Sequence, residues 1–326
     1  MNNYGITKVV KGIHLPGTLS ERQRRTLQSL FPFIGLLFII IFFQVTTGGR
    51  MLTSRNLRTI FNQAFPVLLG TCGVSFVLAQ GNLDFSLGSI VGTAACFGSL
   101  CAGGGLFFSL AASLLAGLLI GFLNGSIHAF FNVSGTVVTL CTQFAFRGVT
   151  IILGSAGLFL PLAWSWLDSV QLKIAAGIFA FALVFFLFEY TKFGKYSRAI
   201  GAGSKAAVQS GIPLKKMKLL AYMFSGLMAG LCGFFALVRA GSVAPTTGTF
   251  FEMNVLLALV LGGMPISGGS AAKLRSALIG SAMFAFLANG LIIWGINDSV
   301  QQGVKGVILL IAVALSFERE NVITIK

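Results

Sequence analysis

Charged side chains are scarce in this sequence. Asp, Glu, Lys and Arg together make up 10% of the 326 residues, whereas apolar residues make up 56%, and the mean hydropathy is +0.90. A soluble domain carries about a quarter charged residues, so this chain has too few of them to cover a water-exposed surface. Lipid must therefore contact much of the exterior, and the composition predicts an integral membrane protein.

Residues that build catalytic and metal sites are equally few. The chain has eight acidic residues, five cysteines without a C-x-x-C pair, and two histidines far apart in the sequence, His14 and His128. This scatter argues against a disulfide framework, a zinc site or a catalytic triad. There is also no G-x-x-x-x-G-K-[ST] loop to hold ATP phosphates. We therefore expect no catalytic residue, no bound cofactor and no metal in this chain.

A relay of carboxylates through the membrane is missing as well. Only Asp84, Glu189 and Glu252 come near the interior of a predicted span, whereas ion-coupled pumps usually keep ionisable residues within the bundle. This weakens the case for a proton-coupled secondary transporter. The energy for active transport would most naturally come from a partner protein.

Basic residues are plentiful but clustered. The formal net charge is +15, and most Lys and Arg residues gather in segments 1–30 and 191–218. Clusters beside apolar spans follow the positive-inside rule, and no basic stretch alternates with aromatic residues as a groove for single-stranded nucleic acid requires. We therefore expect both segments to be cytoplasmic and expect no nucleic-acid partner.

Apolar runs long enough to cross a bilayer recur along the chain. A helical crossing needs about 20 apolar residues, and the pattern predicts an all-α polytopic bundle of about ten transmembrane helices. The third and eighth runs are short or rich in glycine, which allows for broken or re-entrant segments. The predicted spans are 31–47, 60–80, 86–102, 106–123, 135–154, 172–190, 217–238, 254–272, 275–294 and 303–317.

The placement of charge predicts the topology. Six spans separate the basic head from the central loop, and four more return the chain, so both termini are expected in the cytoplasm. The predicted domains are a cytoplasmic tail at 1–30, a transmembrane domain at 31–320 with a cytoplasmic coupling loop at 191–216, and a cytoplasmic tail at 321–326. Arg50, Arg55 and Arg58 depart from the rule because they fall in the first external loop. An interfacial helix before the second span would explain them.

Glycines spaced four residues apart indicate close contacts between helices. Such spacing lets two membrane helices approach backbone to backbone, and several examples together favour a compact bundle. They are Gly88/Gly92, Gly117/Gly121/Gly125 and Gly226/Gly230.

The segment Gly81–Ser89, with the sequence GNLDFSLGS, is the first to carry a family resemblance. It resembles the G-x-(I/L)-D-L-S-V-G-S signature of monosaccharide-type ATP-binding-cassette importer permeases, the ribose transporter family. From the residues alone, Asp84 and Ser86 are suited to cap the next helix. Capping and direct contact with substrate are the two interpretations.

The second segment, residues 194–212, is similar to the cytoplasmic coupling loop of that family, although Lys205 replaces the usual Glu. Its pattern predicts one short amphipathic helix from Ser204 to Ser210, ended by Gly211 and Pro213. Such a helix outside the membrane suits docking of a soluble partner, whereas the alternative is a solvated basic loop. The residues expected to couple to an ATPase are Gly194, Arg198, Gly201, Ser204, Lys205, Ala206, Ala207, Ser210 and Gly211.

A third block, residues 245–254 and 260–269, matches the family's P-x-x-G-x-x-x-E-L-D and V-x-L-G-G-x-x-x-x-G-G patterns, with Asn254 in place of the usual Asp. Its paired glycines permit an unwound segment, which a bilayer tolerates only where protein or water covers it. Shorter matches at 123–125, 139–148, 289–291 and 305–307 extend the likeness from about residue 31 to 317.

The resemblance implies a permease subunit of a sugar importer in the bacterial cytoplasmic membrane. Its partners would be a cytoplasmic ATPase that uses ATP and Mg, a second permease subunit (an identical or a sister chain), an external sugar-binding protein and membrane lipid. The substrate would be a monosaccharide, ribose or a related solute. The polar residues expected to line or gate the pathway are Asp84, Ser86, Asn124, Thr139, Glu252 and Asn289.

Two other functions compete with this one. A stand-alone secondary transporter or channel would need a binding site of its own within the bundle. A membrane-embedded enzyme is disfavoured by the absence of a His, Asp and Glu cluster. For each of the six polar residues, capping or hydrogen bonding between helices is an alternative role.

Overall fold

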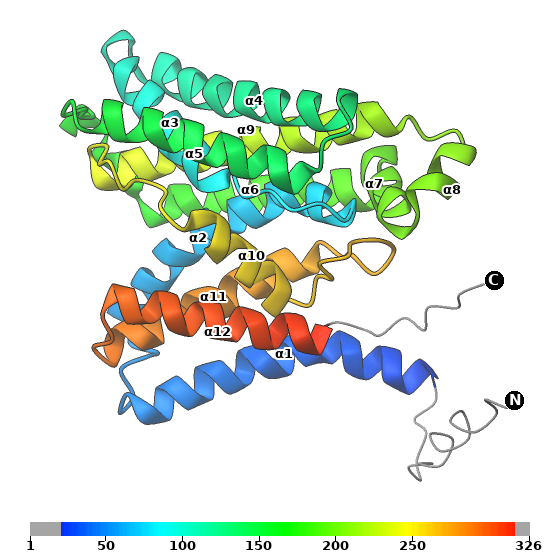
Figure 1. Cartoon of the computed structure of the whole chain (residues 1–326). Helices are drawn as coiled ribbons and strands as arrows, with labels where there is room; N and C mark the ends of the chain where they lie inside the picture. The colour runs from blue at the N-terminus through cyan, green and yellow to red at the C-terminus, as the bar shows by residue number, and fades with distance from the viewer. Residues whose placement is uncertain (1–20, 317–326) are drawn as a thin grey trace, which may run out of the picture.

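The computed structural model describes residues 21–316, and this part of the chain is a bundle of α-helices without a β-strand (Figure 1). The helices are α1 (Glu21–Thr46), α2 (Ser54–Ala79), α3 (Leu87–Leu100), α4 (Leu106–Phe130), α5 (Gly135–Gly154), α6 (Val170–Glu189), α7 (Lys192–Ala202), α8 (Ser204–Gln209), α9 (Leu214–Ala240), α10 (Phe251–Leu261), α11 (Arg275–Ile293) and α12 (Asp298–Ser316), with short 3-10 helices η1 (Ala102–Gly104) and η2 (Leu162–Asp168).

Within residues 21–316, six helices are long and apolar enough to cross a membrane: α2, α4, α5, α6, α9 and α11. Shorter apolar helices are Pro32–Thr46 within α1, α3 and α10. The all-α class and the many apolar helices are therefore confirmed. The number of about ten crossings remains a prediction.

The outer faces of several helices are apolar. Phe38 on α1, Leu119 on α4 and Phe179 on α6 are 66%, 63% and 71% exposed. Contiguous exposed apolar surface of this kind is rare on a soluble monomer, so these faces suit lipid or another membrane subunit.

Small residues hold α4 against α9. A Cβ atom on Gly117 would lie 2.2 Å from the carbonyl oxygen of Gly226, and one on Gly226 would lie 2.2 Å from that of Gly117. No side chain fits between these backbones, which confirms close helix contact at these glycines. Helix α3 is enclosed nearby, with nearly all of its residues buried.

The eighth predicted span is broken in its second half, as its glycines allowed. The pattern predicts an apolar run over 254–272, but α10 ends at Leu261 and residues 262–274 are not helical. Gly263, Gly268 and Gly269 have φ values of +85°, +70° and +85°, a left-handed conformation that glycine adopts readily. Pro265 lacks the amide that another helical turn would need.

The central polar segment contains two helices rather than the single one predicted. Helix α8 lies where the pattern places it, and α7 precedes it over residues expected to be loop. Both lie at one end of the bundle, and α1 begins toward the same end (Figure 1). Arg55 and Arg58 fall within the first turns of α2 rather than in a loop. The predicted tail at 321–326 and residues 1–20 of the N-terminal tail lie outside the described residues, whereas α1 begins at Glu21.

Candidate functional site

Asp84 is the centre of a buried polar network between α2 and α3. Its side chain is 1% exposed. One carboxylate oxygen, Oδ1, accepts hydrogen bonds from the backbone N–H of Ser86 at 3.0 Å and from the Ser86 hydroxyl at 2.6 Å. The other oxygen accepts one from the Ser225 hydroxyl of α9 at 2.9 Å. Asp84 therefore holds Ser86, the N-cap residue of α3, and ties the start of this helix to α9.

The same network reaches α4 and α5. The Asn124 side chain of α4 donates to the Ser86 hydroxyl at 2.8 Å. The Thr139 hydroxyl of α5 accepts from the backbone N–H of Phe85 at 3.2 Å. The structure thus brings together four of the six predicted pathway residues, Asp84, Ser86, Asn124 and Thr139, and buries them all.

Glu252 belongs to a second network, at the start of α10. Its Oε1 accepts a hydrogen bond from the Gln143 amide of α5 at 3.0 Å, and Gln143 in turn accepts from the backbone N–H of Ser89 at 3.3 Å. The other oxygen, Oε2, is buried without a hydrogen-bond partner in the described part of the chain. Glu252 therefore has spare hydrogen-bonding capacity, unlike Asp84.

Arg147 fixes the non-helical segment before α10. Its guanidinium donates to the carbonyl oxygens of Thr247 at 2.7 Å and Gly248 at 3.1 Å. Gly88 of α3 packs on the same segment, because a Cβ atom there would lie 2.3 Å from the Gly248 carbonyl oxygen. The segment is thus held to α5 by side-chain donors and to α3 by backbone contact.

Asn289 stands apart from both networks. It lies on α11 with 2% of its surface exposed, and its Oδ1 has no hydrogen-bond partner among residues 21–316. No described contact joins it to Asp84 or Glu252. The Asp84 and Glu252 networks, by contrast, meet at Ser89, whose hydroxyl donates to the Ser86 carbonyl oxygen at 2.8 Å and whose N–H donates to Gln143. Five of the six predicted pathway residues therefore lie in linked networks, and Asn289 lies apart from them.

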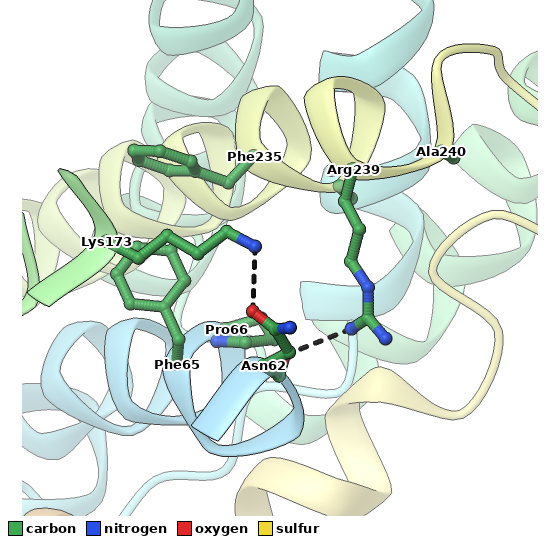
Figure 2. A pocket seen from close by; sticks show the side chains of 8 residues that line it. Asn62, Phe65, Pro66, Lys173, Phe235, Arg239 and Ala240 are labelled. Atoms are coloured by element: carbon green, nitrogen blue, oxygen red, sulfur yellow. Dashed lines mark hydrogen bonds between the residues drawn. The ribbon is translucent and has the colours of Figure 1, made fainter. Parts of the chain in front are cut away.

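A cavity of about 270 Å³ opens elsewhere in the bundle, near the C-terminal end of α9 (Figure 2). The Lys173 ammonium, 2% exposed, donates to the Asn62 side chain at 2.9 Å and pairs with Asp168 at 2.5 Å. Arg239 donates to the Asn62 carbonyl oxygen at 3.0 Å. None of the six predicted pathway residues lines the cavity. Its lining is Asn62, Phe65, Pro66, Lys173, Phe235, Ala236, Arg239 and Ala240.

Helices α7 and α8 present a polar exposed surface at the opposite end of α9. Arg198 ties α7 to α6, because its guanidinium pairs with Glu189 at 2.8 Å and donates to the Phe188 carbonyl oxygen at 3.2 Å. Ala207 is 4% exposed and packs with Ile200 and Met217, so it faces its own chain. We call the exposed residues the α8 surface; they are Ser204, Lys205, Ala206, Ser210 and Gly211.

Within residues 21–316 there is no group of three or more His, Cys, Asp or Glu side chains that could hold a metal ion. The described chemistry is that of hydrogen bonds between packed helices.

Comparison with known proteins shows the family. Residues 56–313 match the family described as "branched-chain amino acid transport system / permease component". The chain belongs to this permease family. The predicted relationship to importer permeases is therefore confirmed.

Curated relatives match this permease over nearly their whole length. It is 29% identical to the ribose import permease protein RbsC of Bacillus subtilis over 316 residues, 94% of this chain and 95% of the relative. It is 28% identical to RbsC of Escherichia coli K12 over 300 residues, with coverages of 87% and 92%. It is 26% identical to the xylose transport system permease protein XylH of the same strain over 384 residues, with coverages of 96% and 98%. No solved structure matches the chain.

Three members of the permease's networks were missed from the sequence. Gln143 and Ser225 are isolated polar residues in apolar runs, so no spacing distinguishes them from surface positions. Arg147 offered a signal, since an arginine within a predicted span is costly and needs partners. Its partners are backbone carbonyls 100 and 101 residues away, which no local pattern reveals.

Proposed function

We propose that this permease is the membrane subunit of an ATP-binding-cassette importer for a monosaccharide, ribose or a related pentose. The observation that carries the proposal is the near full-length similarity to permeases whose names give ribose and xylose as their cargo. The L-arabinose ABC transporter permease protein AraH of Azospirillum brasilense adds a third pentose, at 28% identity over 88% of both chains. All three sugars are small, neutral and polar.

The proposed arrangement has ten membrane segments in residues 31–320, with α3 and α10 as short ones. Both termini and residues 191–216 face the cytoplasm of a bacterium. The clusters of Lys and Arg support this orientation, as does the position of α7 and α8 at the end of the bundle where α1 begins (Figure 1). The first ten residues of α1 would extend from the membrane as helix.

Energy for import would come from a separate ATPase bound at the α8 surface. The permease would bind no ATP and break no covalent bond, and the ATPase would use ATP and Mg. A second permease subunit, identical or a sister chain, would complete the pathway, and an external binding protein would deliver the sugar. Nucleotide binding would then shift the assembly between two conformations, because the nucleotide would bind one of them more tightly than the other.

Among the six predicted pathway residues, Asn124, Glu252 and Asn289 are the stronger candidates for contact with solute. Each has a buried oxygen without a hydrogen-bond partner in the described residues. The Asp84 carboxylate, by contrast, accepts three hydrogen bonds from its own chain. A weakly polar pathway suits import from a tight external receptor, because strong internal binding would slow release.

Reconstitution tests the proposal. The permease is placed in lipid vesicles with its ATPase and binding protein, and uptake of radiolabelled D-ribose, D-xylose, L-arabinose and L-leucine is measured with and without ATP. We expect ATP-dependent uptake of a pentose and none without the ATPase. Uptake of leucine alone, or of any sugar by the permease without its ATPase, would contradict the proposal.

The α8 surface can be tested separately. Lys205→Glu combined with Ala206→Trp alters two exposed residues and should abolish co-purification of the ATPase while the permease remains in the membrane. Lys216→Glu, an exposed lysine at the start of α9, is the matched control for charge. Undiminished binding of the ATPase by the double variant would remove this docking site.

A further inference from the structure

A buried glutamine joins the cytoplasmic helices to the membrane bundle. Gln80 follows the last residue of α2 and is 6% exposed. Its side-chain amide donates to the Ser197 hydroxyl of α7 at 3.2 Å and to the Met217 carbonyl oxygen of α9 at 3.1 Å. One amide group therefore connects three helices.

Backbone contacts surround this glutamine. The carbonyl oxygen of Ala79 accepts a hydrogen bond from the N–H of Gly269 at 2.9 Å. Gly201 of α7 packs on both, since a Cβ atom there would lie 2.1 Å from the Ala79 oxygen and 2.5 Å from the Gly269 nitrogen. No side chain lies between these backbones, so α7 cannot move toward α2 without displacing the backbone at Ala79 or Gly269. We call Ala79, Gln80, Ser197, Gly201, Met217 and Gly269 the Gln80 junction.

The junction leads directly to the Asp84 network. Gly81 turns the chain with φ +75°, and its N–H donates to the Leu78 carbonyl oxygen at 2.9 Å. Asp84 follows three residues later and holds Ser86, the N-cap residue of α3. Residues 81–84 therefore connect Gln80 to the start of α3, and hydrogen bonds fix the Asp84 end of this short segment. A displacement of Gln80 would move the start of α3 through it.

Arg198 attaches α7 to a different helix. Arg198 bonds Glu189 and the Phe188 carbonyl oxygen, both at the end of α6. That contact fixes α7 to its immediate predecessor in the chain. The Gln80 junction instead connects α7 to the end of α2, 117 residues away in sequence.

We propose that Gln80 is a positioning residue that transmits displacement of α7 and α8 to the α2–α3 turn and so to the Asp84 network. The inference rests on the proposed function, in which the ATPase docks on the α8 surface. Gln80 itself contacts neither nucleotide nor sugar. Its role is to keep α7, α9 and the end of α2 moving as one body.

The test uses Gln80→Met, which keeps side-chain length and removes both hydrogen bonds. In vesicles containing the whole transporter, D-ribose uptake and ATP hydrolysis are measured together. We expect ATP hydrolysis to persist while sugar moved per ATP falls about tenfold, the equivalent of losing one to two buried hydrogen bonds. Ser155→Ala is the control, because that hydroxyl is exposed and bonds only the Ile151 carbonyl oxygen of its own helix.

Hydrogen exchange supplies a readout that needs no sugar. On addition of the ATPase and a non-hydrolysable ATP analogue, exchange in peptide 81–86 should change at least threefold in the unaltered permease. In Gln80→Met it should change only in peptides from α7 and α8. Two results for Gln80→Met would overturn the proposal. One is an unchanged ratio of sugar moved to ATP hydrolysed. The other is an equal loss of uptake and hydrolysis while exchange in peptide 81–86 still responds as in the unaltered permease. If α7 and α8 show no response in either protein, it is the docking function that fails.

Discussion

The two buried acidic side chains, Asp84 and Glu252, differ in how fully their oxygens are used. Asp84 accepts three hydrogen bonds from Ser86 and Ser225. Glu252 accepts one, from Gln143, and its second oxygen has no partner in the described residues. Both residues were predicted as pathway residues on equal grounds, and their surroundings now separate them.

The number of hydrogen bonds that each carboxylate accepts indicates which of the two acids stabilises the fold. A buried polar group that loses its partners destabilises the folded state far more than an exposed one. Asp84 is the structural acid of the pair, because its partners are Ser86 at the start of α3 and Ser225 in α9. Glu252 has an oxygen to offer to water or a solute. Four substitutions test this comparison, ordered by the expected change in stability.

Asp84→Ala should be the most damaging. It removes three hydrogen bonds and leaves the Ser86 N–H and the Ser225 hydroxyl buried without an acceptor. We expect the free energy of unfolding, measured by SDS titration in mixed micelles, to fall by about 3 kcal/mol. A fall no larger than that of Ser225→Ala would mean that Asp84 is not the structural acid of the pair.

Arg147→Leu should be next. The substitution leaves the Thr247 and Gly248 carbonyl oxygens without their charged donor, a loss of about 2 kcal/mol. The segment before α10 should loosen, and hydrogen exchange of peptide 244–250 measures this directly. Peptides of α4 provide the internal control, and equal acceleration there would indicate global unfolding rather than release of this segment.

Ser225→Ala removes one partner of Asp84 and leaves the other. The Ser86 contacts remain, so SDS titration should show a loss of about 1 kcal/mol. In the double variant with Asp84→Ala the two losses should not add, because the serine has nothing left to bond. Full additivity would contradict the direct contact.

Glu252→Gln should change stability least. Glutamine preserves an acceptor for Gln143, so the free energy of unfolding should stay within about 0.5 kcal/mol of the original. Sugar uptake in the reconstituted transporter should nevertheless fall severalfold, since the oxygen proposed to face solute becomes an amide. Unchanged uptake would assign Glu252 to the same structural class as Asp84.

Much of the helix pattern followed from hydropathy alone. The predicted span 135–154 has the same bounds as α5, because the segment stays predominantly apolar in spite of Gln143 and Arg147. The run at 254–272 is helical only as far as Leu261, and the paired glycines that permit an unwound segment follow it. Hydropathy predicts which segments are buried in lipid or protein, but it does not predict where a buried backbone stops being helical.

Helix α7 escaped prediction for a different reason. Its basic residues and two glycines, Gly194 and Gly201, suggested loop, although Thr191 gives an N-terminal cap to the Phe193 N–H at 3.2 Å. Both glycines lie against the backbone of other helices, Gly194 at Phe188 of α6 and Gly201 at Ala79 of α2. Gln80 and Ser225 were overlooked because their partners lie 117 and 141 residues away. Tertiary contacts of this range leave no local trace.

The buried Lys173 beside the cavity of Figure 2 bears on how the chain enters the membrane. In the proposed orientation its end of α6 must pass through the bilayer during synthesis, and an unpaired lysine at mid-membrane costs about 3 kcal/mol. Asp168, five positions earlier, can cross with it as a neutral pair. In the folded chain the ammonium then has a further acceptor in Asn62 of α2, a helix that is synthesised before α6.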